Sequence, residues 1–314
     1  MKIAAVIVTY NRLEKLKNTV ACSLGEALDK IIIVDNASTD GTGEWLSQQA
    51  DSRLVCLHLE QNIGGSGGFS KGFAKALELN VDWLVCYDDD AFPQNGAIAE
   101  FRHFSEKNID STLAGVAAAV YGPDGSIMEM NRPSFHPFKS LIQSAKTLCF
   151  GRKGFHIPDS YYQKQEPQSI QASSFVGCFV RCSSIRDKLD LPRTELFIYA
   201  DDILYTLNMA QRGYKHYFVP TIRFTHDCET VSQRKKYTPL WKAYYTYRNG
   251  IELYRVTSGW LFPFVMAVKA VSWTKNATLY EEKSKYLALT FEAIKHGLMR
   301  DFSQNHQTLL EKYK

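Results

Sequence analysis

The sequence predicts an α/β protein with a mainly parallel, Rossmann-like sheet flanked by helices, followed by a helical C-terminal extension. Continuous apolar runs in the first hundred residues suit strands that are buried on both faces, and amphipathic helix patterns separate them. Such alternation predicts parallel pairing. Short polar clusters follow these runs, at the strand ends where α/β sheets bind their ligands. We therefore expect a functional site where the clusters meet.

Four strands are expected in this first part. Asn11 is placed to cap the first helix, and residues 38–41 begin the second. The glycine-rich run 62–69 precedes a third helix that extends to about Leu79. The apolar runs that predict strands are residues 3–8, 31–34, 54–59 and 83–87.

The later part of the chain is less regular. A helix is expected to begin at Asp201 and to end at Gly213, and residues 133–169 lack a clear period, which predicts a long excursion near the acceptor. Further strands are expected at residues 115–121, 174–180 and 217–220. We expect a catalytic domain at residues 1–235, with a nucleotide-sugar half to about residue 92 and an acceptor half at 93–235, and a helical, aromatic and basic region at 236–314.

Composition restricts the function classes. The 314 residues suffice for one large α/β domain with an appendage. A net charge of +4 is too small to indicate nucleic-acid binding. The 7 cysteines have no metal-site spacing, and the N-terminus lacks a signal-peptide pattern. We therefore expect reduced thiols and a cytoplasmic location.

Three consecutive carboxylates, Asp88, Asp89 and Asp90, end the fourth strand. Side chains alternate in extended chain, so Asp88 and Asp90 are expected on one side and Asp89 on the other. Buried carboxylates need a partner, and two hard oxygen ligands suit Mg²⁺ or Mn²⁺ carrying a phosphorylated substrate. A surface turn or a helix N-cap cluster is the alternative. The position beside Asn11, Asp35 and the other clusters favours the metal.

These blocks resemble the inverting GT-A glycosyltransferases of family 2 over roughly residues 1–250. The asparagine–glycine run and the Asp triplet look most like the galactofuranosyltransferases of that family, so the resemblance implies UDP-galactofuranose as donor and Mn²⁺ or Mg²⁺ as cofactor. The blocks that look like the family's nucleotide-binding segments are residues 8–12, 34–41 and 62–65.

The resemblance also implies roles for single residues in donor binding. Tyr10 would line the uracil, Asp35 would accept a hydrogen bond from it, and glycines would let backbone amides approach the phosphates. A capped turn, an Asx turn and a flexible linker are the alternatives for these three features. The residues expected to bind the nucleotide sugar are Thr9, Tyr10, Arg12, Asp35, Asn62, Gly64, Gly65 and Asp89.

Two later features complete the expected site by resemblance. His226 is similar to the histidine that joins the metal ligands Asp88 and Asp90; a structural histidine is the alternative. The pair Asp201–Asp202 resembles the family's acidic base motif, with Asp202 as the base and Asp201 as its support. In the alternative, both carboxylates cap the helix.

The C-terminal region combines basic and aromatic residues. Residues 260–273 are apolar apart from Lys269 but too short to span a bilayer. Their basic and aromatic neighbours suit a peripheral contact with anionic lipid headgroups, and packing on the catalytic domain or in a homo-oligomer is the alternative. These neighbours are Arg234, Lys235, Lys236, Trp241, Lys242, Tyr244, Tyr245, Tyr247 and Arg248.

The expected function is metal-dependent, inverting transfer of galactofuranose from UDP-galactofuranose to a hydroxyl of a lipid-linked cell-surface glycan, such as an O-antigen or another envelope polysaccharide. The expected location is the cytoplasm, peripherally on the inner membrane. One alternative is a rhamnosyltransferase that uses dTDP-rhamnose, suggested by the block at residues 247–249. A nucleotide-sugar hydrolase is another. A non-catalytic glycan- or nucleotide-binding module would need neither the Asp triplet nor Asp201–Asp202.

Overall fold

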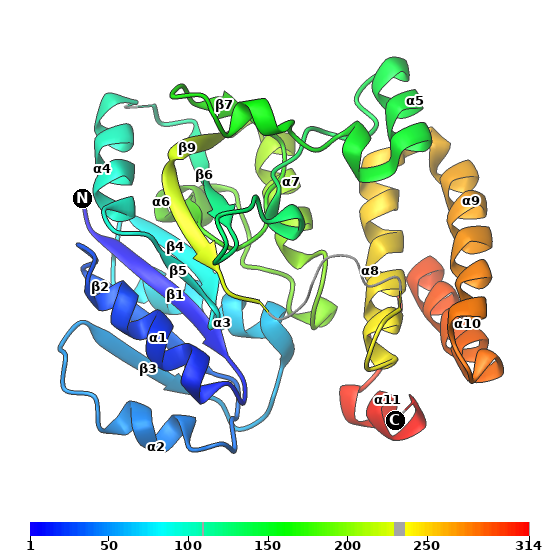
Figure 1. The fold of residues 1–314 in the computed structure, drawn as a ribbon, viewed down its shortest axis with the longest axis horizontal. Helices are drawn as coiled ribbons and strands as arrows, with labels where there is room; N and C mark the ends of the chain where they lie inside the picture. Colours follow the sequence, from blue (N-terminus) through cyan, green and yellow to red (C-terminus); the bar gives the residue numbers. More distant parts are fainter. Residues whose placement is uncertain (109, 229–235, 314) are drawn as a thin grey trace.

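The computed structural model describes residues 1–108, 110–228 and 236–313 (Figure 1). Its first four strands pair in parallel, in the order β3-β2-β1-β4. They are β1 (Ile3–Thr9), β2 (Lys30–Asp35), β3 (Leu54–His58) and β4 (Trp83–Asp88). The apolar runs of the sequence therefore form the expected buried parallel strands.

The later strands extend the sheet in the order β8-β6-β9-β5. Strand β8 is antiparallel to both β4 and β6, β9 is parallel to β6, and β7 pairs with β9 outside the main order. The mainly parallel sheet is thus confirmed, with an antiparallel strand at its centre. These strands are β5 (Ala91–Pro93), β6 (Leu113–Tyr121), β7 (Gln168–Ser169), β8 (Cys178–Arg181) and β9 (Lys215–His226).

Helices cover both faces of the sheet. On one face the odd-numbered residues of β1 pack with α1 and α4; on the other its even-numbered residues pack with α3 and α7. This alternation follows from the two-residue period of a strand. The helices of this part are α1 (Leu13–Leu24), α2 (Thr42–Ser47), α3 (Gly64–Glu78), α4 (Ala97–Lys107), α6 (Cys182–Asp187) and α7 (Asp201–Gln211).

A helical C-terminal region stands beside the sheet, as expected (Figure 1). It has an aromatic core in which Tyr247 stacks on Trp273 with ring centroids 4.5 Å apart, and Tyr280 stacks on Tyr286. Its helices are α8 (Trp241–Ser258), α9 (Phe262–Lys275), α10 (Lys283–Met299) and α11 (His306–Tyr313).

The aromatic and basic residues that suggested a lipid contact are largely buried instead. Tyr244, Tyr245, Tyr247 and Arg248 have almost no exposed surface, so the prediction that they meet lipid headgroups is wrong. They pack because α8 is the central helix of its region. Arg234 and Lys235 lie outside the described residues.

One helical stretch of the described chain, Trp241–Leu279, is long and apolar enough to cross a membrane by length and composition. Its best 18-residue window has a mean hydropathy of 1.2, and 28% of that window is buried. The stretch folds back at the short 3₁₀ turn Gly259–Leu261, so α8 and α9 lie side by side (Figure 1).

Several local expectations need correction. The glycine-rich run lies inside the first turns of α3, because the helix begins at Gly64. The excursion at 133–169 contains a helix, α5 (Leu141–Phe150). Asn11 does not cap α1: its side chain accepts a hydrogen bond from the Thr39 amide, and Asp40 accepts one from the Leu13 amide. Residues 217–220 and 222–226 belong to one continuous strand, β9, which ends at His226 and leaves Asp227 outside it.

Candidate functional site

The polar clusters meet at one edge of the parallel sheet. Thr9 lies opposite Asp35 in the register of β1 and β2, and Val8 lies opposite Asp88 in that of β1 and β4. His58, at the end of β3, lies opposite Asp35. The carboxyl ends of four neighbouring strands therefore present their polar residues side by side.

Asp88, Asp90 and His226, the three expected metal ligands, lie together in a cluster that could hold a metal ion. Their ligand atoms lie within 4.8 Å of one another. A divalent ion with ligand distances of about 2.1 Å can join such a set after small side-chain movements. His226 reaches the triplet because β9 pairs with β5, which places it opposite Ala91.

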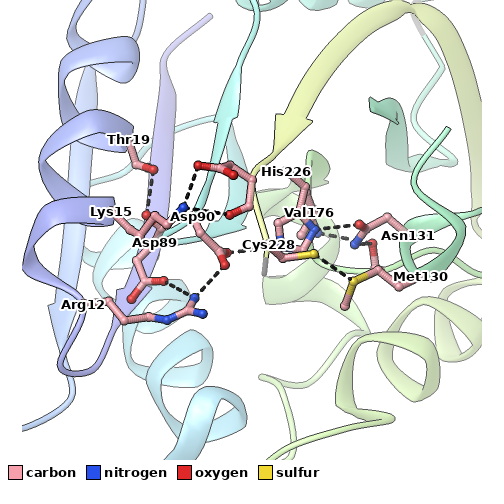
Figure 2. A network of polar contacts seen from close by, with 12 residues as sticks. Arg12, Lys15, Thr19, Asp89, Asp90, Met130, Asn131, Val176, His226 and Cys228 are labelled. Carbon is pink, nitrogen blue, oxygen red and sulfur yellow. Dashed lines mark hydrogen bonds and ion pairs between the residues drawn. The ribbon is translucent and has the colours of Figure 1, made fainter. Parts of the chain in front are cut away.

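The hydrogen bonds of His226 show that this donor set fits a cation (Figure 2). The Asn131 amide nitrogen lies 3.0 Å from Ser174 Oγ, to which it donates, so the Asn131 oxygen faces His226 Nδ1 at 2.8 Å. Nδ1 therefore carries hydrogen, and Nε2 points at Asp90 Oδ1, 3.1 Å away. A proton or a metal ion must lie between these two acceptor atoms. Burial lowers the pKa of His226, but Asp90 and Asp88 outweigh it and raise the pKa.

Arg12 and Thr9 hold the other carboxylates of the triplet. Arg12 Nη1 donates to Asp89 Oδ1 at 3.0 Å and to Asp90 Oδ2 at 2.6 Å, and Thr9 Oγ1 donates to Asp89 Oδ2 at 2.8 Å. Asp89 is not part of the metal-ligand cluster of Asp88, Asp90 and His226; it lies in the turn after β4, where Arg12 Nη1 joins it to Asp90. Burial raises the pKa of Asp89 despite the charge of Arg12.

Asp201 and Asp202 begin α7. The N-cap residue is Ala200, which makes no side-chain hydrogen bond, but Asp202 Oδ1 accepts from the Ile203 amide at 2.7 Å, so one carboxylate of the pair bonds the backbone of the first helical turn. Burial and the charge of Asp202 raise the pKa of Asp201 to about 8. Burial raises the pKa of Asp202 to about 6, although the hydrogen bond from the Ile203 amide opposes the shift. At pH 7 one carboxyl is therefore mainly protonated and the other mainly ionised.

The charge around these groups is not balanced by the protein. Burial and the charge of Asp90 raise the pKa of Asp88 to about 7. Asp90 differs: burial opposes its ionisation, but His226 and Arg12 hold its pKa below the ordinary value. Raised carboxyl pKa values record a shortage of positive charge, and a divalent cation would supply it.

Gly64 brings α3 close to the segment before α7. Its φ is +78°, and a Cβ there would lie 2.2 Å from the carbonyl oxygen of Phe197. The backbone amide of Ser66, two residues further along, donates to that same oxygen at 3.0 Å. At Gly65 an added Cβ would meet nothing within 4 Å, so this stretch of backbone faces open space. The glycines join the two halves of the site rather than forming a flexible linker.

The remaining expected donor residues lie at the same edge. Tyr10 is exposed at the end of β1, and Asn62 Oδ1 accepts from the Gly64 amide at 2.8 Å. Asp35 does form a turn, since Oδ1 accepts from the Ser38 amide at 2.9 Å, while Oδ2 lies 3.2 Å from His58 Nδ1.

Sequence reasoning missed three residues of this site. His58 ends β3 and was hidden by its position one residue before the expected strand end. Asn131, which orients His226, comes from the irregular middle of the chain. Phe197 contributes a backbone carbonyl, for which no side-chain signal exists. A polar residue at the end of every strand would have been a usable signal for His58 alone.

Comparison with known families agrees with this geometry. The family model described as "Glycosyl transferase family 2" matches residues 4–187, more than half of the chain. The chain belongs to glycosyl transferase family 2. The match includes the Asp triplet and ends before Asp201 and His226. The protein is therefore a glycosyltransferase with a GT-A fold, as the resemblance implied.

Individual relatives share limited sequence identity with this chain. The galactofuranosyltransferase GlfT1 of Mycolicibacterium smegmatis is 26% identical over 231 residues, which cover 73% of this chain and 72% of the relative. An undecaprenyl-phosphate mannosyltransferase of Micrococcus luteus is 36% identical over 98 residues, 30% of this chain and 40% of the relative, so the chain spans less than half of that protein.

A solved structure of a mannosyltransferase has a similar fold. The mannosyltransferase PcManGT of Pyrobaculum calidifontis, solved with GDP-Man and Mn²⁺, superposes with a TM-score of 0.55 at 15% identity, over 99% of this chain and 78% of that one. At this identity the likeness concerns the fold alone.

Proposed function

We propose that this glycosyltransferase transfers galactofuranose, with inversion, from UDP-galactofuranose to a hydroxyl of a lipid-linked glycan. The observation that carries the proposal is the cluster of Asp88, Asp90 and His226 at the sheet edge, within electrostatic reach of an acidic pair on α7 in which Asp201 is buried and Asp202 half-buried. Similarity to a galactofuranosyltransferase over 73% of the chain supports the sugar.

Each residue has a stated part in the donor half of the proposal. Asp88, Asp90 and His226 would hold Mn²⁺ or Mg²⁺, which when bound neutralises the charge that develops on the leaving diphosphate. Tyr10 would line the base, Asp35 would accept from it, and the remaining nucleotide contacts would come from Thr9, Arg12, Asn62, Gly64, Gly65 and Asp89. Arg12 would also hold Asp89 and Asp90 in place and favour the ionised form of Asp90.

Asp202 is the proposed general base. Its carboxylate takes the proton of the acceptor hydroxyl as that oxygen bonds to the anomeric carbon, and the bond from this carbon to the diphosphate oxygen breaks on the opposite side. A pKa of about 6 leaves it ionised at neutral pH. Asp201, with a pKa of about 8, is the neutral partner that supports it. Two carboxyls separated in this way suit an acid–base division of roles.

The block at residues 247–249, which suggested dTDP-rhamnose as donor, does not support that alternative. Residues 247–249 are buried in α8, so they do not distinguish between donors. The test is a donor screen with UDP-galactofuranose, UDP-galactopyranose and dTDP-rhamnose, each with Mn²⁺ and with Mg²⁺. Nucleotide release is measured with and without simple glycoside acceptors, beside Asp202→Asn as control. We expect acceptor-dependent release with UDP-galactofuranose; turnover of dTDP-rhamnose alone contradicts the donor, and free sugar without acceptor indicates a hydrolase.

We also propose a peripheral contact with anionic lipid at the cytoplasmic face of the inner membrane, through the α5 surface. This surface consists of exposed apolar side chains of α5 and of the turn into α9, which lie at the same end of α8 (Figure 1). Leu141 is 79% exposed and Trp260 81%. The others are Ile142, Leu148, Phe150 and Phe264.

Charge complements the apolar side chains of the α5 surface. Residues 139–153 carry four exposed basic side chains, Lys139, Lys146, Arg152 and Lys153, and no acidic residue. Apolar groups beside basic ones suit the headgroup region of anionic membranes. A lipid-linked acceptor would then be met at the membrane surface.

Vesicle flotation tests this contact. We expect the protein to float with anionic vesicles but not with zwitterionic ones, and Phe150→Glu to abolish flotation. Phe291→Glu, on the exposed side of α10, is the matched control that keeps it. Absence of flotation contradicts the proposal, and concentration-dependent mass in light scattering would then assign the α5 surface to a homo-oligomer.

A further inference from the structure

The block at residues 247–249 has a definite place in the fold. Arg248 is 1% exposed and Asn249 is not exposed at all. Arg248 Nη2 donates to the carbonyl oxygens of Glu195 at 3.1 Å and Leu196 at 2.9 Å. The Arg248 side chain of α8 therefore reaches the segment that precedes the carboxyl pair Asp201–Asp202.

Asn249 makes the closer set of contacts. Its amide nitrogen lies 2.9 Å from the Leu196 oxygen, 2.7 Å from that of Ile198 and 3.0 Å from that of Tyr199. The backbone oxygens of this partly buried segment need such donors, because beyond the short 3₁₀ turn Thr194–Leu196 it has no helix or strand to supply them.

The contacted backbone adopts conformations that side-chain-bearing residues avoid. Phe197 has φ 67°, Tyr199 φ 68° and Ala200 φ 64°. Such conformations are strained and persist only where the surroundings enforce them. The donors from α8 supply that enforcement.

The segment is also held from the opposite side. The Phe197 oxygen accepts from the Ser66 amide of α3, and Ser66 Oγ donates to the Arg193 oxygen at 2.8 Å. In Figure 1 the segment lies between α3 and α8. Its last residue, Ala200, is directly followed by Asp201 and Asp202, so any shift of the segment also moves these two carboxyl groups.

We propose that Arg248 and Asn249 are positioning residues for glycosyl transfer. They hold residues 195–200 in the backbone conformation that places Asp202 at the acceptor hydroxyl. This inference rests on the proposed role of Asp202. It assigns the block to the alignment of the base and not to donor recognition.

Asn249→Asp tests the inference with almost no change of shape. It replaces the donating amide by an oxygen that faces three carbonyl oxygens. Misplacement of a reacting group by about 1 Å costs roughly 100-fold in rate, so we expect kcat to fall by about that factor. The KM of the donor should change less than about twofold, because the donor edge is built by β1, β2 and β4.

Tyr286→Phe is the matched control. It removes a buried hydroxyl that contacts Tyr247 and the Trp273 backbone within the same aromatic core, but that does not touch residues 195–200. We expect kcat close to wild type in this variant. Calorimetric binding of UDP with Mn²⁺ should be retained in both variants, and amide hydrogen exchange at residues 195–204 should accelerate in Asn249→Asp alone.

Two results overturn the inference: Asn249→Asp with near-wild-type kcat, or equal losses of kcat in Asn249→Asp and Tyr286→Phe. If Asn249→Asp does not fold, Arg248→Lys replaces it, with an expected loss of kcat of about tenfold at unchanged UDP binding. Asp202→Asn, assayed in parallel, separates the two proposals. Activity in that variant removes the proposed base, whereas its inactivity beside an active Asn249→Asp removes only the positioning role.

Discussion

Asp201 and Glu252 are both buried carboxyls, but the protein surrounds them differently. Burial raises the pKa of Asp201 to about 8, and the charges of Asp202 and Asp88 add to the shift. Glu252, 2% exposed in α8, receives hydrogen bonds from Arg193 at 2.9 Å and Arg300 at 2.8 Å. One carboxyl is crowded by like charge, and the other is compensated by opposite charge.

The difference separates function from architecture. A buried carboxylate whose partners are arginines keeps two elements together, as Glu252 joins α8 to the segment before α7. A buried carboxylate without a cation is costly in the free protein and is retained where a substrate or metal supplies the missing charge. A buried carboxyl therefore indicates a structural ion pair in α8 and a functional site at the start of α7.

The largest effect is expected from Asp202→Asn. An amide cannot accept the acceptor proton, so transfer should fall by at least about 10³-fold, while UDP binding with Mn²⁺ stays within about threefold of wild type. Steady-state transfer assays and calorimetry measure the two quantities. Transfer near the wild-type rate would show that the crowded carboxyls are not the catalytic ones.

The pH profile should follow the same carboxyl. The pKa of Asp202 is raised to about 6, and transfer needs its ionised form, so the rate should fall about tenfold per unit as the pH drops below that value. Saturating Mn²⁺ should move this limb to lower pH by stabilising the carboxylate. A rate that is constant down to pH 4 contradicts the assignment.

Glu252→Gln should destabilise the protein. The neutral amide leaves Arg300 without its carboxylate and Arg193 with Glu195 alone, and the expected loss is about 2 kcal/mol, because both arginines can still reach water. Urea unfolding monitored by fluorescence measures it. Unchanged stability would mean that this cluster is not what holds α8 in place.

Asp201→Asn, the equivalent change at the start of α7, should stabilise the folded protein. The folded protein holds the Asp201 proton up to about pH 8, whereas the unfolded chain releases it near the ordinary value of 3.8, so native stability falls as the pH rises through this window. Removing the charge should stabilise the metal-free protein by at least about 1 kcal/mol at pH 8, with a smaller gain towards pH 4. Thermal unfolding at both pH values checks this; a loss of stability at pH 8 contradicts it.

The sequence predicted the parts of this molecule that depend on short-range pattern. The strands β1 to β4, the start of α7 at Asp201 and the meeting of Asp88, Asp90 and His226 followed from apolar runs, from the polar residues after them and from the family resemblance. The burial of Arg248 and its tyrosine neighbours was not predicted, because helical spacing does not show which neighbours will cover a residue. The Asn249 contacts go to backbone oxygens, which carry no residue identity.

The contact between Gly64 and Phe197 has a consequence for how such enzymes diversify. Because the base-bearing segment is held by α3 on one side and by α8 on the other, a new C-terminal region cannot simply be exchanged by recombination at the end of the sheet. A chimera that takes residues 236–313 from a relative must also take residues 193–200, or it will inherit a nucleotide site without an aligned base. Changes of acceptor in this lineage are therefore expected to come as linked replacements of both segments.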